Sequence, residues 1–151
     1  MIIVDTNLLI YAYNADAPLH TPAATWLEAL FNSEEEIGFA EVVLIGFIRI
    51  VTQKRIVPAP LPPEQAVRLV ESWLSAPNAR LLFATPESFA QSLNAIRAVG
   101  VAGNLCTDAQ IAGLAGVYRA TVASVDTDFL RFSGLKVINP LAPSAPAGRL
   151  K

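Results

Sequence analysis

Cysteine and histidine are almost absent from this chain. Its 151 residues include one of each, Cys106 and His20. A single cysteine excludes an internal disulfide and a metal site built from several thiolates. No serine or cysteine is set up with a histidine that would act as its base, so the sequence offers no nucleophile of the hydrolase-triad type. Catalytic chemistry in this chain therefore needs other side chains.

Charge is scarce as well. Charged residues make up 16% of the chain and hydrophobic residues 53%, and the formal net charge is −2. A net negative charge argues against nucleic-acid binding through a broadly basic surface. A nuclease of this composition would need a metal ion and a local basic patch. The mean hydropathy of +0.44 is high for a soluble protein, and we expect the apolar excess to cover a homodimer or partner surface.

Long hydrophobic runs are also missing. The densest apolar stretch, residues 42–48, is far shorter than the roughly 20 residues that cross a bilayer. The opening MIIVDTN carries no basic and apolar leader, so we expect a cytoplasmic protein with no membrane attachment. The length suits one domain, predicted over residues 1–141. The Pro- and Ala-rich segment 142–151 is predicted to be a disordered tail.

Short apolar runs alternate with helix-like segments along the chain. The expected strands are 2–4, 37–40, 80–84, 121–125 and 136–138, and the expected helices are 6–13, 21–31, 41–51, 66–74, 86–99 and 107–118. Thr21 and Thr85, each followed by proline, and Thr107 are the expected N-caps of three of these helices. This alternation is typical of an α/β fold with a parallel sheet covered on both faces. Such sheets bind ligands beyond the carboxyl ends of their strands.

Four of the five aspartates stand in apolar contexts at expected strand or helix ends. They are Asp5 in IIVDTN, Asp108 in CTDAQIAG, and Asp126 and Asp128 in SVDTDF. Carboxylates held close together repel one another, and a divalent cation that prefers oxygen ligands relieves that repulsion. The sequence therefore predicts a metal site in which Asp5, Asp108 and Asp126 are ligands.

Neighbouring polar residues are expected to support this site. Thr6, Asn7 and Thr107 are placed to bind water or to hold the carboxylates, and Asp128 is an accessory. A Mg²⁺ ion held by a few carboxylates keeps water and phosphate oxygens as its other ligands, so the expected chemistry is hydrolysis of a phosphodiester. Each aspartate alone is equally explained as a helix cap. Three such caps, with almost no aspartate elsewhere, favour a site.

Three short motifs follow one another along the chain. They are DTN after the first strand, TDAQIAGLA at a late helix start, and SVDTDFLRF followed by LKVINPL. In this order they resemble the PIN-domain ribonucleases, most of all the VapC toxins of bacterial toxin–antitoxin systems, from Met1 to about Leu141. The resemblance implies a three-layer αβα sandwich with a central, mostly parallel sheet of four to five strands.

The resemblance also implies an activity. It implies an endoribonuclease that depends on Mg²⁺ or Mn²⁺ and cleaves structured RNA, with a VapB-type antitoxin as partner. Asp5, Asp108 and Asp126 match the acidic positions of the family, and Asp128 matches a frequent companion in the last motif.

Glu41 is a further candidate for the catalytic set, and here the chain departs from the family pattern. Many relatives carry a Glu directly before an apolar-Arg pair, where this chain reads Phe47-Ile48-Arg49. An alignment on AEV instead places Glu41 at the acidic position. The sequence leaves both alignments open, and a charge at a helix start explains Glu41 equally well.

Arg49, Lys54 and Arg55 form a small basic cluster, which is either a set of RNA phosphate contacts or a solvated helix end. Two other functions stay open. The displaced Glu41 motivates a PIN-like module that binds RNA or a partner without cutting. Phosphotransfer to Asp5 is less favoured, because neither DTN nor SVDTDF cleanly supplies the second acidic residue and the late lysine that such domains need.

Overall fold

A five-stranded sheet with all neighbouring strands parallel forms the centre of the molecule. The computed structural model describes residues 1–143, so most of the predicted tail lies outside the described residues. The strands are β1 (Ile2–Val4), β2 (Ile37–Ala40), β3 (Ala79–Leu82), β4 (Thr121–Ala123) and β5 (Lys136–Ile138). Their order across the sheet is β3-β2-β1-β4-β5.

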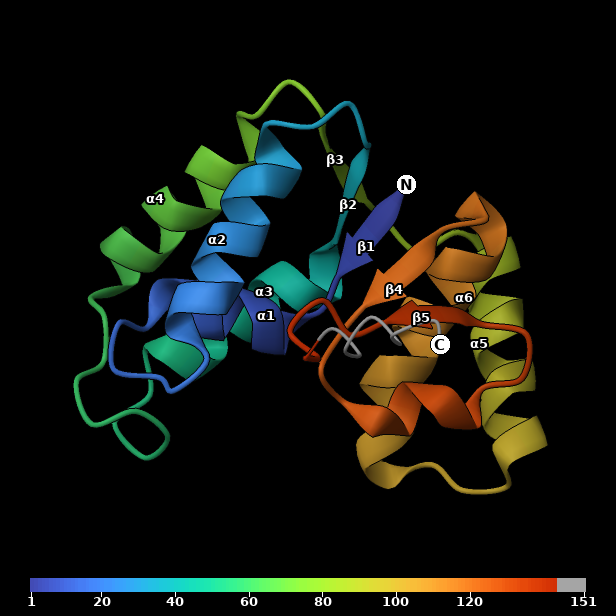
Figure 1. The fold of residues 1–151 in the computed structure, drawn as a ribbon. Coiled ribbons are helices and arrows are strands. Elements are labelled where there is room, and N and C mark those ends of the chain that lie inside the picture. Colours follow the sequence, from blue (N-terminus) through green and yellow to red (C-terminus); the bar gives the residue numbers. More distant parts are fainter. Residues whose placement is uncertain (144–151) are drawn as a thin grey trace, which may run out of the picture.

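Six α-helices cover the two faces of this sheet. They are α1 (Thr6–Tyr13), α2 (His20–Phe31), α3 (Glu41–Val51), α4 (Pro63–Leu74), α5 (Pro86–Val99) and α6 (Cys106–Tyr118), with two 3₁₀ turns, η1 (Gly103–Leu105) and η2 (Thr127–Arg131). The first four helices lie on one side of the sheet, and α5 and α6 lie on the other (Figure 1). The predicted three-layer αβα sandwich with a parallel sheet is confirmed.

The core lies mainly between the central strands and the helices that flank them. All four residues of β2 are buried, as expected of a strand covered on both faces. Phe39 of β2 stacks on Trp73 of α4, and Phe47 of α3 meets the same indole edge-on, with ring centroids 4.8 Å apart. These aromatic contacts fix α3 and α4 against the sheet, and so fix where α3 begins.

Several predicted boundaries are wrong by a few residues. Helix α2 begins at His20 rather than Thr21, and α6 begins at Cys106, so Thr107 lies inside its first turn and is not its cap. Turn η1 runs directly into α6 and supplies the preceding turn, which removes the need for a capping side chain. Thr85 is confirmed as a cap, because it exchanges hydrogen bonds with Ser88.

Two strands end earlier than predicted, and helix α4 begins three residues earlier. Strand β3 ends at Leu82, opposite the last residue of its partner β2, and β4 ends at Ala123. Helix α4 begins at Pro63, where proline suits a first turn whose N–H groups have no partner within the helix. No helix within residues 1–143 is long and apolar enough to cross a membrane.

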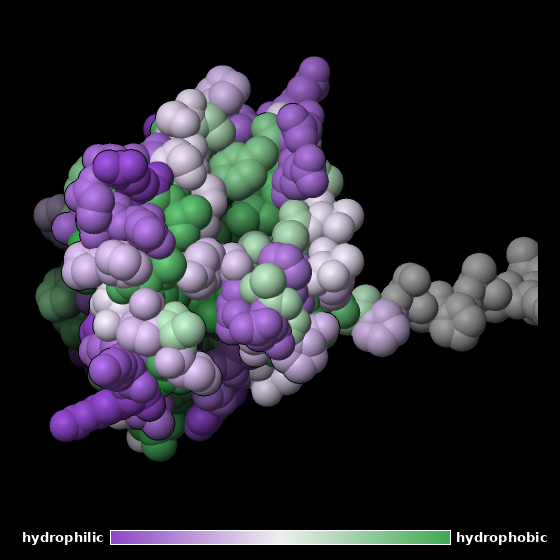
Figure 2. Space-filling view, turned by 90° about the vertical axis from the view of Figure 1, so that its left-hand side faces the viewer, coloured by the Kyte–Doolittle hydropathy of each residue, from purple (hydrophilic) through white to green (hydrophobic). Residues whose placement is uncertain are grey.

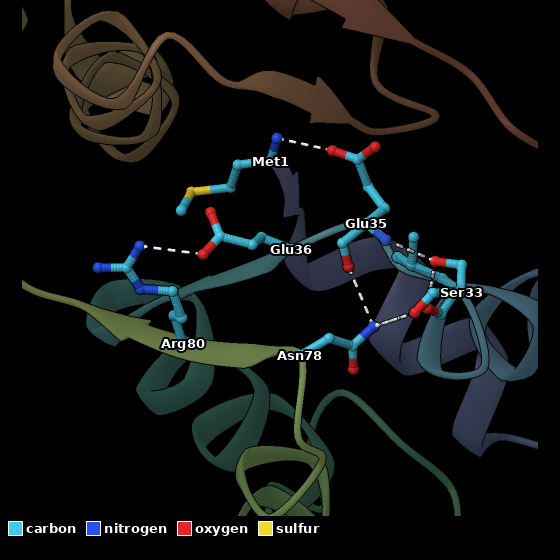
Figure 3. Close-up of polar contacts among 7 residues, drawn as sticks. Met1, Ser33, Glu35, Glu36, Asn78 and Arg80 are labelled. Atoms are coloured by element: carbon cyan, nitrogen blue, oxygen red, sulfur yellow. Dashed lines mark hydrogen bonds and ion pairs between the residues drawn. The ribbon is translucent and has the colours of Figure 1, made fainter.

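Polar contacts close the edge of the sheet at which the strands begin (Figure 3). The side-chain amide of Asn78 lies 3.0–3.1 Å from three carbonyl oxygens, those of Leu30, Ser33 and Glu35. Arg80 of β3 pairs with Glu36, which directly precedes β2. These contacts hold the start of β3 against the segment that leads into β2. They lie at the edge of the sheet opposite to the one where the strands end.

Gly113 sets the distance between α5 and α6. A Cβ at this position would collide with the backbone oxygen of Ser88 and with the side chain of Ser92, both on α5. At Gly116, one turn later, a Cβ would meet only the end of the Gln91 side chain, which can move. The close approach at Gly113 therefore places α6, and whatever its first turn carries, relative to the sheet.

We expect Gly113→Ala to lower the free energy of unfolding by about 1–3 kcal/mol, because the backbone of α5 must move away. Gly116→Ala is the matched control on the same helix. Alanine is about 1 kcal/mol better than glycine inside a helix, and the Gln91 side chain can yield, so this variant should be neutral or more stable. Urea denaturation measures both, and equal effects would contradict the close contact.

Candidate metal centre

The aspartates singled out in the sequence lie at the edge of the sheet where the strands end. Asp5 directly follows β1, and Asp126 lies three residues after the end of β4, the strand paired with β1. Asp108 lies in the first turn of α6, and Asp128 in η2. Parallel pairing of β1 with β4 therefore brings together residues that are more than 100 positions apart in the sequence.

Three of these carboxylates form a compact group. One oxygen from each of Asp108, Asp126 and Asp128 lies within 4.8 Å of the other two. Asp5 stands beside this group and is only 7% exposed. Its charge acts on Asp108, as the pKa of that residue shows.

The site is electrostatically strained. Burial, followed by the negative charges of Asp5, Asp126 and Asp128, raises the pKa of Asp108 to about 6. Burial also raises the pKa of Asp5, assisted by Asp126 and opposed by hydrogen bonds from Ser124 and from the Thr6 backbone. Carboxylates that resist ionisation in this way form a site that gains most from a bound cation.

Ser124 connects the two sides of the site, and the sequence analysis missed it. Its side chain is buried, and its hydroxyl donates to Asp5 Oδ2 at 2.6 Å. Ser124 Oγ also accepts hydrogen bonds, from Asn7 Nδ2 at 3.1 Å and from the backbone N–H of Asp126 at 2.9 Å. The available signal was a small polar residue at the end of a buried strand, directly before the Asp126 motif.

The carboxamide of Asn7 is left half satisfied. The Ser124 proton is used for Asp5, so Asn7 must present its NH₂ group to Ser124 Oγ. Within residues 1–143 its other atom, Oδ1, is buried and has no hydrogen-bond partner. A buried acceptor without a donor costs about 1–3 kcal/mol, and a metal-bound water is a donor of the kind it lacks. This oxygen and the repelling carboxylates both fit a hydrated divalent cation.

Glu41 lies at the same edge of the sheet but outside the aspartate group. It is exposed in the first turn of α3, directly after β2. It lines a separate cavity of about 280 Å³, together with residues of α5 and α6 that include Phe89 and Gln110. Its charge is not among the causes that raise the pKa of Asp108. A catalytic role for Glu41 stays a prediction.

The supporting and RNA-binding candidates are placed as follows. Thr6 gives its backbone N–H to Asp5 Oδ1 at 2.7 Å, and its hydroxyl to the Val43 carbonyl of α3. Thr107 is exposed in the first turn of α6. The basic cluster is exposed at the far end of α3 and in the turn that follows: Arg49, Lys54 and Arg55.

Comparisons with known proteins identify the family of the chain. The family model of the PIN domain matches residues 2–135. The chain is 42% identical over 141 residues to "Ribonuclease VapC33" of Mycobacterium tuberculosis, and the match covers 93% of this chain and 99% of the relative. The chain therefore belongs to the PIN-domain family and, within it, to the VapC ribonucleases. The family prediction made from its motifs is confirmed.

Solved structures share the fold. VapC20 of Mycobacterium tuberculosis, described as a sarcin–ricin loop cleaving toxin, superposes with a TM-score of 0.68 at 16% identity, covering 90% of this chain and 99% of that one. VapBC2 from Rickettsia felis, bound to a DNA fragment from its promoter, superposes with a TM-score of 0.67 at 21% identity, covering 92% and 98%.

We expect Asp108→Asn to stabilise the metal-free protein. The folded-state pKa of Asp108 is raised above that of an unfolded aspartate, so its charge opposes folding at pH 7. With allowance for solvent screening at this half-buried group, its removal should add about 1 kcal/mol, or about 3 °C in Tm. Mg²⁺ should raise the Tm of the unaltered protein more than that of the variant.

Asp16→Asn, at an exposed aspartate between α1 and α2 that is outside the aspartate group, is the control and should leave both values unchanged. Differential scanning calorimetry with EDTA and with Mg²⁺ makes the comparison. A lower Tm for metal-free Asp108→Asn would mean that the carboxylate holds the fold rather than a cation.

Proposed function

We propose that this chain is a metal-dependent endoribonuclease, the toxin of a type II toxin–antitoxin pair, and that it cleaves structured RNA in the cytoplasm. The observation that carries the proposal is the convergence of Asp5, Asp108, Asp126 and Asp128 at one edge of the sheet. The curated relative at 42% identity is named a ribonuclease. VapC20, described as a toxin that cleaves the sarcin–ricin loop, supports a folded RNA element as the substrate class.

In this proposal Asp5, Asp108 and Asp126 would hold Mg²⁺ or Mn²⁺, with Asp128 as an accessory. Such an ion supplies charge to a scissile phosphodiester and lowers the pKa of an attacking water. The protein's own contribution is orientation. Thr6 N–H and the Ser124 hydroxyl each hold one oxygen of Asp5, and Ser124 also holds the backbone of Asp126. The two strand ends therefore present their carboxylates as one rigid unit.

An antitoxin of the VapB type is the proposed protein partner, because similar chains are seen in VapBC complexes. Figure 2 views the side of the molecule that carries α2 and α4, and shows apolar side chains gathered in a hollow between polar margins. An apolar hollow of this kind suits a partner helix or extended segment. An Arg from such a segment would also satisfy the aspartate group in place of a metal.

A second copy of the chain is the proposed occupant of a different surface. Ile45 of α3 is 61% exposed and Phe89 of α5 is 56% exposed, and both line the small cavity beside Glu41. Phe83, directly after β3, and Leu93 of α5 are exposed as well. Single exposed apolar residues are ordinary, but a group around one hollow is typical of an interface.

Ile45→Glu with Phe89→Glu should therefore convert a dimer into a monomer, because two charges cannot be buried in an apolar interface. Ile56→Glu, at a residue 54% exposed in the turn after α3, is the control and should leave the mass unchanged. Light scattering coupled to gel filtration reports the mass. If the unaltered protein is a monomer, the proposed dimer is contradicted.

We expect Asp5→Asn to reduce RNA cleavage by about 100-fold or more, since changes around a metal's ligands alone cost 10- to 100-fold. The measurement is cleavage of a labelled RNA hairpin with Mg²⁺, with Mn²⁺ and with EDTA. Asp16→Asn should cleave normally. Full cleavage by Asp5→Asn, or by the unaltered protein in EDTA, would contradict the proposed site.

A binding module without catalysis is the second candidate function. It is motivated by Glu41, which lies exposed and outside the aspartate group. The same assay separates the two functions. Tight RNA binding without metal-stimulated turnover would favour the module.

A further inference from the structure

A groove of about 650 Å³ lies between helices α5 and α6 and the segment 131–136, separate from the aspartate group. Its floor is made by small residues on facing positions of the two helices, including Ala95, Ala112 and Ala115. Its other wall is the segment 131–136, which leads from η2 into β5. Six polar side chains line this α5–α6 groove: Gln91, Asn94, Arg119, Arg131, Ser133 and Lys136.

The charge of the groove is of one sign. Arg119, Arg131 and Lys136 line it, and none of its lining residues within the described chain is acidic. The whole chain, in contrast, has 13 acidic and 11 basic residues. Three cations around one hollow therefore mark a local positive region on a protein whose net charge is negative, and an anion is the ligand such a region attracts.

One ion pair links the groove to the aspartate group. Arg131, at the end of η2, lies 3.8 Å from Asp128 at the start of the same turn. Asp128 belongs to the aspartate group, whereas Arg131 lines the groove. On α6 the lining runs from Ala112 to Arg119, and Arg119 lies about 16 Å along the helix from Asp108, so the groove leads away from the site.

Arg119 is held in an unusual backbone conformation. Its φ of 51° is the one positive φ at a residue other than glycine within residues 1–143. It caps the C-terminus of α6, a position where glycine or asparagine is usual. A charge at a helix C-terminus is favourable, but a lysine or arginine earlier in the last turn would supply it without the strain. An arginine in this strained conformation points to a use for its side chain.

We propose that the α5–α6 groove binds the sugar–phosphate backbone of the RNA substrate next to the scissile site. The inference rests on the proposed ribonuclease function. The aspartate group repels phosphates unless metal is present, so affinity must come from cations close to it but outside it. The groove offers these cations, together with amide and hydroxyl groups that can bond phosphate and 2′-hydroxyl oxygens.

The test is RNA binding as a function of salt. Fluorescence anisotropy of a labelled RNA hairpin with the full-length protein in EDTA gives affinity without cleavage. Each phosphate contact contributes about 0.7–0.9 to the slope of log K against log salt. Arg119→Gly with Lys136→Gln should therefore lower the slope by about 1.4–1.8, while Tm stays the same or rises, because glycine suits the positive φ. Arg119→Lys should restore most of the slope.

The matched control is Arg68→Gln with Arg80→Gln, which removes two charges on α4 and β3. An unchanged slope in the groove variant, or an equal drop in the control, overturns the groove. A drop produced instead by Arg49→Gln with Lys54→Gln assigns the RNA to the basic cluster and also overturns it. A polyglutamate peptide serves as an anion that is not RNA. If the groove variant loses binding to this peptide but keeps its binding to RNA, the proposal is also overturned.

Cleavage by the unaltered protein with Mg²⁺ separates the two proposals. If the protein cuts RNA while the groove variant binds with an unchanged slope, the groove fails and the ribonuclease function stands. If the unaltered protein neither binds nor cuts RNA, both fail.

Discussion

The repulsion among four carboxylates is the interaction on which the rest of the molecule depends. Asp5 follows β1, Asp108 lies in α6, and Asp126 and Asp128 lie at the start of η2, and the pKa of Asp108 is raised to about 6 by burial and by the other three charges. In a fold that held these carboxylates less firmly, their side chains would rotate apart toward the solvent. The scaffold resists this with β1 paired to β4, with α6 held close to α5, and with Ser124 bonded to both strand ends. Much of the architecture thus holds together groups that repel.

The same constraint separates the surfaces of the molecule by role. A site this negative cannot attract RNA by itself, so phosphate binding has to come from basic residues nearby, and the α5–α6 groove supplies them through Arg131. Apolar residues gather elsewhere, around Ile45 and Phe89 and on the side of α2 and α4. A toxin can in this way engage substrate, a second copy and an antitoxin at different faces. The local basic groove also explains how a chain with a net charge of −2 can act on a polyanion.

Much of this arrangement could be predicted from the sequence, because it depends on local patterns. Buried parallel strands read as apolar runs such as Ile2–Val4, and the rule that ligands lie beyond strand ends was sufficient to place Asp5 and Asp126 together. What failed depends on contacts across the fold. Thr107 was expected to cap α6, but the preceding 3₁₀ turn already supplies that role. Ser124 was missed because a lone serine carries no functional signal in the sequence. Its role depends on its contacts with Asp5 and Asp126, and strand pairing brings Asp5 close to it.

The central claim is that the aspartate group holds a divalent cation. Anomalous diffraction from crystals of the protein soaked in Mn²⁺ tests it most directly, because manganese is located without reference to activity. The account predicts a peak bounded by carboxylate oxygens of Asp108 and Asp126, with Asp5 as a direct or water-linked ligand. A peak bound elsewhere, or no peak with the carboxylates turned apart, would contradict it.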